Sequence, residues 1–198
     1  MAYTTSRTLI CGLNDEKKTK AWQESWDKFE KKYKKLIFHI GIKNGLNSTE
    51  QGELLNNVML AVYKKSTTFD FTKGKFRTWL SKVIHNKICD IYRVKKRLAI
   101  QTSLTDEDDT KPDKAIPVDI IGDIIKKEWN NYICAEAMKS LKTKVKPETY
   151  RAFEMYVQRL DIKDIAQATG MTEKNVYVCA ARCAKKLKGI SKELKRNI

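Results

Sequence analysis

The sequence predicts an all-α protein of two small helical domains joined by an acidic linker, with a helix-turn-helix in the second domain. Apolar residues recur at steps of three and four along most of the 198 residues, and we find no strand-like alternation. Only 8 glycines and 3 prolines are present, which argues against a turn-rich β protein. Hydrophobic residues make up 41% and charged residues 32%, so the chain can bury the core of small helical units.

The first domain is expected to span residues 1–100 and to contain three helices. Apolar stripes predict these helices over residues 14–43, 48–63 and 75–97. Asn44 and Gly45 are expected to end the first helix. Ser48, followed three residues later by Gln51, resembles a capping box at the start of the second helix.

An acidic linker is predicted over residues 101–120, and the second domain over residues 121–198. Between residues 102 and 123, seven carboxylates oppose two lysines, a net charge of −5 in a basic protein. Pro112 and Pro117 break any helix there. Helical periodicity then resumes and continues in shorter segments to the end of the chain.

The stretch from Ile162 to Leu187 has the pattern of a helix-turn-helix. Gly170 can adopt the positive φ of a tight turn, Thr172 can cap the next helix, and Val176 can pack back on the preceding one. The polar face of the second helix can then reach base edges and phosphates of duplex DNA. Its candidate contact residues are Thr172, Lys174, Asn175, Tyr177, Val178, Arg182 and Lys185. The alternative is an ordinary helical hairpin in a core.

The charge balance indicates a polyanionic partner. Forty basic and 24 acidic side chains give a net charge of +16, for which nucleic acid is the first partner to consider and anionic lipid the rival. No run of 18 apolar residues exists, and the start of the chain lacks the apolar stretch of a signal peptide. We therefore expect a cytoplasmic protein with no membrane partner.

Basic and aromatic residues gather on the third predicted helix and in the loop before it. Residues 75–97 hold eight basic side chains and one acid, and Trp79 falls on a polar stripe of that helix. This combination suits single-stranded nucleic acid, because bases stack on rings while cations follow the phosphates. The candidates are Phe69, Phe71, Lys73, Lys75, Arg77, Trp79, Lys82, Asn86, Arg93, Lys96 and Arg97. The alternative places Trp79, Phe69 and Phe71 in the core and the charges on a solvated face.

Metal and catalytic chemistry find little support in the sequence. His85 and Cys89 are four residues apart, as are Cys179 and Cys183, and such pairs can bind zinc where their helices meet. The two pairs lie in different predicted domains, so we expect no metal and read the five cysteines as reduced thiols. With two histidines and no readable catalytic arrangement, we expect no enzyme, no cofactor and no small-molecule substrate.

The motifs of both domains together resemble those of a known family. Residues 53–63, 69–70 and 74–80, with Asn86, Asp90 and Arg93, resemble the conserved second region of sigma factors of bacterial RNA polymerase. The predicted helix-turn-helix resembles their fourth region. The order of the motifs, the linker and the lack of an intermediate domain resemble the small extracytoplasmic-function (ECF) group.

The resemblance implies a transcription initiation factor that binds core RNA polymerase, recognises promoter DNA and assists strand opening. Glu53, Asn56 and Asn57 would dock on the polymerase clamp, at positions where the family usually has aspartate, glutamine and glutamate. The loop 69–75 would hold an unstacked base of the minus-ten element, and the stripe of the third helix would line the melted strand. An anti-sigma protein is a further partner that the resemblance allows.

The recognition helix would read the minus-thirty-five element. Its Arg182 and Lys185 match the family, whereas Tyr177 and Cys179 stand where basic residues are frequent. The rival hypothesis is an autonomous helix-turn-helix regulator of transcription, which would bind DNA without the polymerase.

Overall fold

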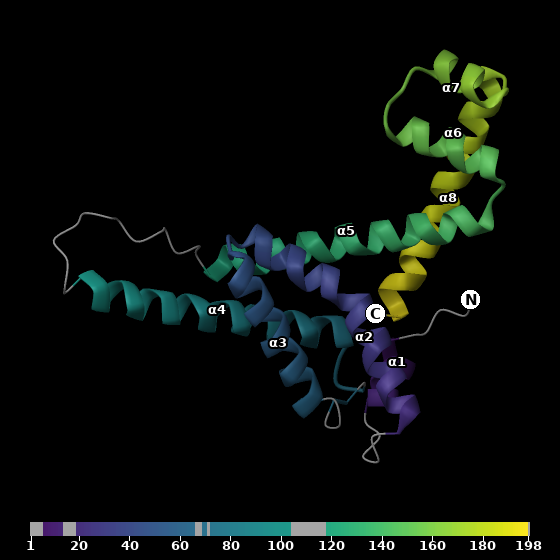
Figure 1. Ribbon diagram of the computed structural model, residues 1–198. Helices are drawn as coiled ribbons and strands as arrows, with labels where there is room; N and C mark the ends of the chain where they lie inside the picture. Colours follow the sequence, from purple (N-terminus) through teal and green to yellow (C-terminus); the bar gives the residue numbers. More distant parts are fainter. Residues whose placement is uncertain (1–5, 14–18, 66–68, 71, 104–117, 198) are drawn as a thin grey trace. The chain divides into compact units, whose positions relative to one another are not determined.

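The computed structural model of the protein describes residues 6–13, 19–65, 69–70, 72–103 and 118–197 (Figure 1). All regular structure in these residues is helical, as predicted, and none of it is strand. The helices are α1 (Ser6–Leu13), α2 (Lys20–Lys43), α3 (Ser48–Lys65), α4 (Phe76–Ser103), α5 (Val118–Lys144), α6 (Pro147–Val157), α7 (Ile162–Thr169) and α8 (Glu173–Asn197).

The described residues form two compact units. The first runs to Trp129 and the second covers Asn130–Asn197, so α5 contributes to both. The division therefore falls inside a helix and beyond the boundary near residue 120 that the sequence suggests. Trp129 contacts the ring of Tyr33 on α2, which joins the early part of α5 to the first unit. The acidic residues 106–113 lie outside the described residues.

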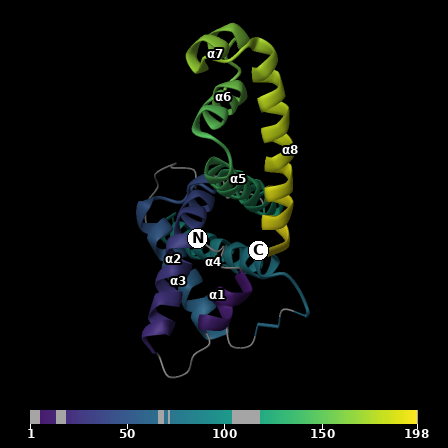
Figure 2. The same ribbon diagram turned by 90° about the vertical axis from the view of Figure 1, so that its right-hand side faces the viewer.

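Within the first unit, α1 packs on α2, α2 on α3, and α3 on α4 (Figures 1 and 2). The apolar stripes predicted for α2, α3 and α4 supply most of this core, because one face of each helix is removed from water. α1 is a further helix, beyond the three that the sequence predicts for this domain, and it adds Leu9 and Ile10 to the core. The buried residues of this core include Leu9, Ile10, Phe29, Tyr33, Leu36, Ile37, Ile40, Leu54, Val58, Val62, Phe76, Leu80, Ile84 and Ile88.

The turn between α2 and α3 has the residues that the sequence assigns to it. α2 ends at Lys43, and the backbone N–H of Asn44 donates to the carbonyl of Ile40 over 3.1 Å. Gly45 follows with a φ of 70°, a conformation that glycine adopts without steric cost. The hydroxyl of Tyr92 donates to the carbonyl of Asn44 and so joins α4 to this turn.

The helix ends differ in detail from the predicted ones. α2 begins at Lys20, because Thr19 is extended and accepts a hydrogen bond from the N–H of Trp22. The capping box of α3 lies one residue earlier than expected: the Asn47 side chain accepts from the Glu50 N–H, and the Glu50 carboxylate accepts from the Asn47 N–H. α4 continues to Ser103, beyond the predicted end at residue 97.

The second unit consists of the later part of α5 with α6, α7 and α8, and α6 and α7 lie beside α8 (Figure 2). Its main core cluster comprises Ala137, Leu141, Phe153, Ala180, Cys183 and Ile190. Burial raises the pKa of the Cys183 thiol, which is one of these core residues. Pro147 stands in the first turn of α6, where its missing N–H removes no helical hydrogen bond.

The α7–α8 pair has the local geometry that its sequence predicts. Gly170 has a φ of 66° and its N–H donates to the carbonyl of Ala166. The Thr172 hydroxyl accepts from the N–H of Asn175 over 3.3 Å at the start of α8. Ile165 and Val176 meet in a small buried cluster, so the two helices pack on each other through the residues expected to join them.

Candidate nucleic-acid interface

One face of α4 carries an exposed row of polar and basic side chains. Lys82, Asn86, Arg93 and Lys96 are all exposed and lie at steps of three, four and seven residues, so they share one helix face, here called the α4 stripe. Lys75, which precedes the helix, and Arg97 in its later part are also exposed. The structure thus brings these predicted contact residues together on an accessible surface.

The one acid within residues 75–97 is already engaged on this surface. Asp90 accepts from Arg93 over 3.0 Å and from Lys87 over 3.4 Å. Such exposed pairs contribute about 0–1 kcal/mol, so Arg93 can exchange Asp90 for a phosphate at little cost. The α4 stripe therefore keeps a net positive charge.

Aromatic rings gather at the amino-terminal end of α4. The ring of Trp79 lies 5.4 Å from that of Phe69 and 5.3 Å from that of Phe76, measured between ring centroids. Phe76 is buried, whereas Phe69 and Trp79 are half-buried. Phe69 and Trp79 thus pack on the core with part of their surface and leave the rest accessible. Phe71, the third predicted aromatic, lies outside the described residues.

The loop before α4 is held by a short hydrogen-bonded turn. The Asp70 carboxylate accepts from the Thr72 hydroxyl over 2.6 Å and from its N–H over 2.8 Å, and both bonds lower the pKa of Asp70. The N–H of Lys73 donates to the carbonyl of Asp70, and the Lys73 side chain is highly exposed. The ammonium group of Lys73 lies 3.8 Å from the Asp70 carboxylate at the surface of the loop.

Arg77 is placed differently from the other predicted strand contacts. Its guanidinium lies 5.4 Å from the ring centroid of Trp129, a buried residue of α5. Burial lowers the pKa of Arg77, although guanidinium remains protonated at neutral pH. Trp129 also meets the ring of Tyr33 at 6.0 Å. Sequence reasoning missed Trp129, which the four-residue spacing from Ile121 and Ile125 marks as a core position.

The predicted polymerase contacts share a face of α3. Glu53 and Asn56 are exposed and Asn57 is half-buried, at a spacing that puts all three on one side of the helix. Leu60 continues the same face one turn later and is 50% exposed. Sequence reasoning did not single out Leu60, an accessible apolar side chain beside the three polar ones.

The seven predicted contact residues of α8 and its cap are all exposed to solvent. The apolar side of the same helix is buried at Val176, Ala180 and Cys183. Tyr177 is 55% exposed and its ring lies 6.5 Å from that of Tyr156 on α6. The amino-terminal half of α8 therefore presents an accessible mixed face of lysine, arginine, asparagine, tyrosine and valine.

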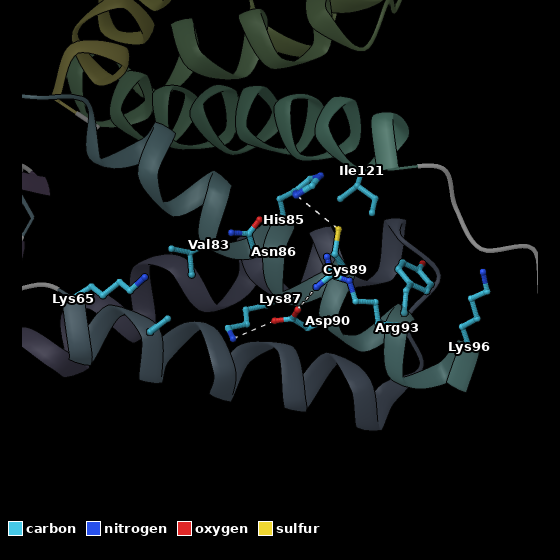
Figure 3. A pocket seen from close by; sticks show the side chains of 12 residues that line it. Lys65, Val83, His85, Asn86, Lys87, Cys89, Asp90, Arg93, Lys96 and Ile121 are labelled. Atoms are coloured by element: carbon cyan, nitrogen blue, oxygen red, sulfur yellow. Dashed lines mark hydrogen bonds and ion pairs between the residues drawn. The ribbon is translucent and has the colours of Figure 1, made fainter. Parts of the chain in front are cut away.

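A groove of about 640 Å³ runs along α4 in the first unit, bordered by Lys65 of α3 and Ile121 of α5 (Figure 3). His85 and Cys89 line it, with the Cys89 sulfur 3.8 Å from His85 Nδ1. No group of three or more potential metal ligands occurs in the part of the chain that the structure describes.

The comparisons with known proteins bear on the first unit. Residues 23–98 match the family model of sigma-70 region 2. No curated protein and no solved structure matches the chain. Among the described helices, none has the length and apolarity needed to span a membrane. The matched segment contains α3, the loop and most of α4, and it supports membership of the sigma-70 family and a role in transcription initiation.

Proposed function

Starting from a sigma-70 region 2 segment at residues 23–98, we propose that the protein is an ECF-type sigma factor. It binds core RNA polymerase, directs it to promoter DNA and assists strand opening, without enzymatic activity of its own. Its first domain binds the polymerase and the minus-ten element, and its second binds the minus-thirty-five element.

The observation that carries this proposal is the combination of the α4 stripe with the aromatic pair beside it. Trp79 and Phe69 offer partly accessible rings at one end of a row of exposed cations. Unstacking a base costs a few kcal/mol, and stacking on a protein ring returns about 1–3 kcal/mol per base. Duplex DNA keeps its bases paired, so this surface gains its advantage once the strands separate.

The remaining surfaces fit the same division of work. The exposed face of α8 has the length and charge to enter a major groove, with Lys174 and Asn175 near its start and Arg182 and Lys185 about two and three turns later. The α3 face of Glu53, Asn56, Asn57 and Leu60 offers a docking surface with polar and apolar side chains. A single recognition helix reads one half-site, which makes specific binding depend on the polymerase.

Open-complex formation on duplex promoter DNA tests the proposal. Holoenzyme reconstituted with the triple variant Lys82→Ser/Arg93→Ser/Lys96→Ser is expected to form fewer open complexes on duplex promoters. Because the variant binds the melted strand more weakly, its open-complex formation should also depend less on the salt concentration. The matched control removes three exposed lysines of α2: Lys31→Ser/Lys35→Ser/Lys43→Ser. If the two triple variants had equal effects, the α4 stripe would act only through the overall charge of the protein, which would contradict the proposed contact.

The rival function is an autonomous DNA-binding regulator that uses only the second domain. The accessible face of α8 suits both functions. A specific footprint at a defined promoter by the free protein, at physiological salt and without polymerase, would favour the regulator.

A further inference from the structure

Cys89 lies within the α4 stripe. It follows Asn86 by three residues and precedes Arg93 by four, so its side chain shares their helix face. The thiol is partly accessible and lines the groove shown in Figure 3. Nucleic acid that follows the α4 stripe must pass over this sulfur.

The groove supplies a base to the thiol. The Cys89 sulfur and His85 Nδ1 are 3.8 Å apart on successive turns of α4, and Figure 3 shows the two side chains directed toward each other. In the tautomer with Nδ1 unprotonated, the imidazole accepts the thiol hydrogen. Since the thiolate is the nucleophilic form of cysteine, a neighbouring proton acceptor favours reaction at this site.

The groove also attracts anions. Four cationic side chains line it, against one carboxylate, that of Asp90: Lys65, Lys87, Arg93 and Lys96. The net lining charge is +3 with His85 neutral, from four positive groups and one negative group. A small molecule that carries carboxylates is therefore concentrated beside the thiol.

The other cysteines have different surroundings. Cys11 and Cys134 are exposed, Cys179 is half-buried on α8, and Cys183 is buried in the core of the second unit. The second histidine, His39, contacts the carbonyl of Lys35 on α2. Among the described residues, the thiol–imidazole contact is therefore specific to Cys89.

We propose that Cys89 is a redox modification site that forms a mixed disulfide with a small anionic disulfide of the glutathione type. The thiol proton passes to His85 Nδ1, and the Cys89 sulfur attacks one sulfur of the disulfide. A new S–S bond forms as the old one breaks, and the leaving thiolate takes the proton from His85. One thiol and one disulfide give one mixed disulfide and one thiol, so no further oxidant is needed.

The mixed disulfide should also affect transcription initiation, an inference that rests on the proposed function. The attached group places carboxylates between Asn86 and Arg93, where the phosphates of a melted strand would lie. Like charges repel the strand and the added bulk fills part of the groove. The mixed disulfide thus lowers open-complex formation, and reduction restores it.

The chemistry is tested on the reduced full chain with glutathione disulfide as the anionic probe and cystamine as the cationic one. Peptide mass spectrometry at short times is expected to show Cys89 modified by glutathione disulfide about tenfold faster than the exposed Cys134. His85→Gln should remove most of this advantage, and Lys65→Ser/Lys96→Ser should slow glutathione disulfide but not cystamine. Labelling of Cys89 no faster than Cys134, or unchanged by His85→Gln, would overturn the site.

The consequence is tested separately with reconstituted holoenzyme. Pre-treatment with glutathione disulfide should lower open-complex formation for the wild-type chain, and dithiothreitol should restore it. For Cys89→Ser the ratio of treated to untreated activity should stay near one, whereas Cys134→Ser should respond as the wild type does. If Cys89 is labelled selectively but initiation is unchanged, the proposal that the mixed disulfide repels the melted strand is wrong. Absence of polymerase binding would instead contradict the proposed function and leave the labelling result standing.

Discussion

Trp79 has two contacts that serve folding and a free surface that can serve binding. Its ring meets Phe69 and Phe76 in tilted geometry, yet the side chain is only half-buried. The sequence placed it among cations on the polar side of α4. The structure places it at the border between that side and the core, because the loop before α4 brings Phe69 over it.

Substituting Trp79 and its buried neighbour separates the two roles. Trp79→Ala should lower the free energy of unfolding by about 1–3 kcal/mol, since each of its two aromatic pairs contributes about 0.5–1.5 kcal/mol. Phe76→Ala should cost about 3–5 kcal/mol, because that ring is fully packed. Denaturant unfolding of both variants measures the difference.

The same Trp79 variant should initiate poorly on duplex promoters and recover part of its activity on a pre-melted template, where the unpairing cost is already met. The activity of Trp79→Phe, which retains a ring, should lie between that of the wild type and that of Trp79→Ala. A stability loss as large as that of Phe76→Ala, with no recovery on the bubble, would assign Trp79 to folding alone.

Glu50 joins the start of α3 to α4. Its carboxylate accepts from Lys95 over 2.8 Å while capping the Asn47 N–H. Burial alone would raise the pKa of Glu50, but the hydrogen bonds from Lys95 and Asn47 and the charge of Lys95 hold it below 4.5, its ordinary value. The folded state therefore favours the ionised carboxylate.

Glu50→Gln keeps an amide oxygen for the cap and removes the charge. It should lower the free energy of unfolding by about 1 kcal/mol at neutral pH. Because the folded pKa lies below the unfolded one, this contribution is complete above about pH 4.5 and is lost as the pH falls through the folded pKa. Urea titrations of both proteins at neutral and acidic pH check this, and a constant difference at every pH would contradict it.

At the scale of an element, the α7–α8 turn depends on a left-handed glycine. Gly170→Ala should destabilise the second unit by about 1–2 kcal/mol, the cost of this conformation for a residue with a Cβ. Gly189 lies inside α8 with no neighbouring atom within 4 Å of the position of an added Cβ. Gly189→Ala should therefore stabilise by up to about 1 kcal/mol. Thermal unfolding of the pair measures the opposite signs, and a shift in the same direction would contradict the turn geometry.

A helix could be predicted from the sequence where its apolar residues form a single stripe that packs against one core. Gly45 and Gly170 mark turns, because glycine lacks a Cβ and adopts a positive φ without steric cost. The cap of α3 was misplaced by one residue, since Asn47 and Ser48 are both good capping residues and local pattern does not choose between them. Here the Lys95 side chain, distant in sequence, meets Glu50 and favours the earlier register.

At the scale of the molecule, the candidate surfaces were predictable because exposed charge on a helix follows from its period. Most of the basic residues assigned to α4 and α8 are accessible. Arg77 is the exception among the basic residues of α4 assigned to the strand, because Trp129 of α5 covers its guanidinium. That contact joins segments far apart in sequence, as does the groove around Cys89, and periodicity within one helix carries no information about either.

The central claim is that the chain gives core RNA polymerase its promoter specificity. The most direct measurement combines bacterial core polymerase, the full chain and a randomised promoter library, and sequences the transcripts. We expect the polymerase with the chain to start from templates that share two sequence blocks at a fixed spacing, and the polymerase alone to show no such selection. Starts unchanged by the chain, together with specific DNA binding by the chain alone, would contradict the claim.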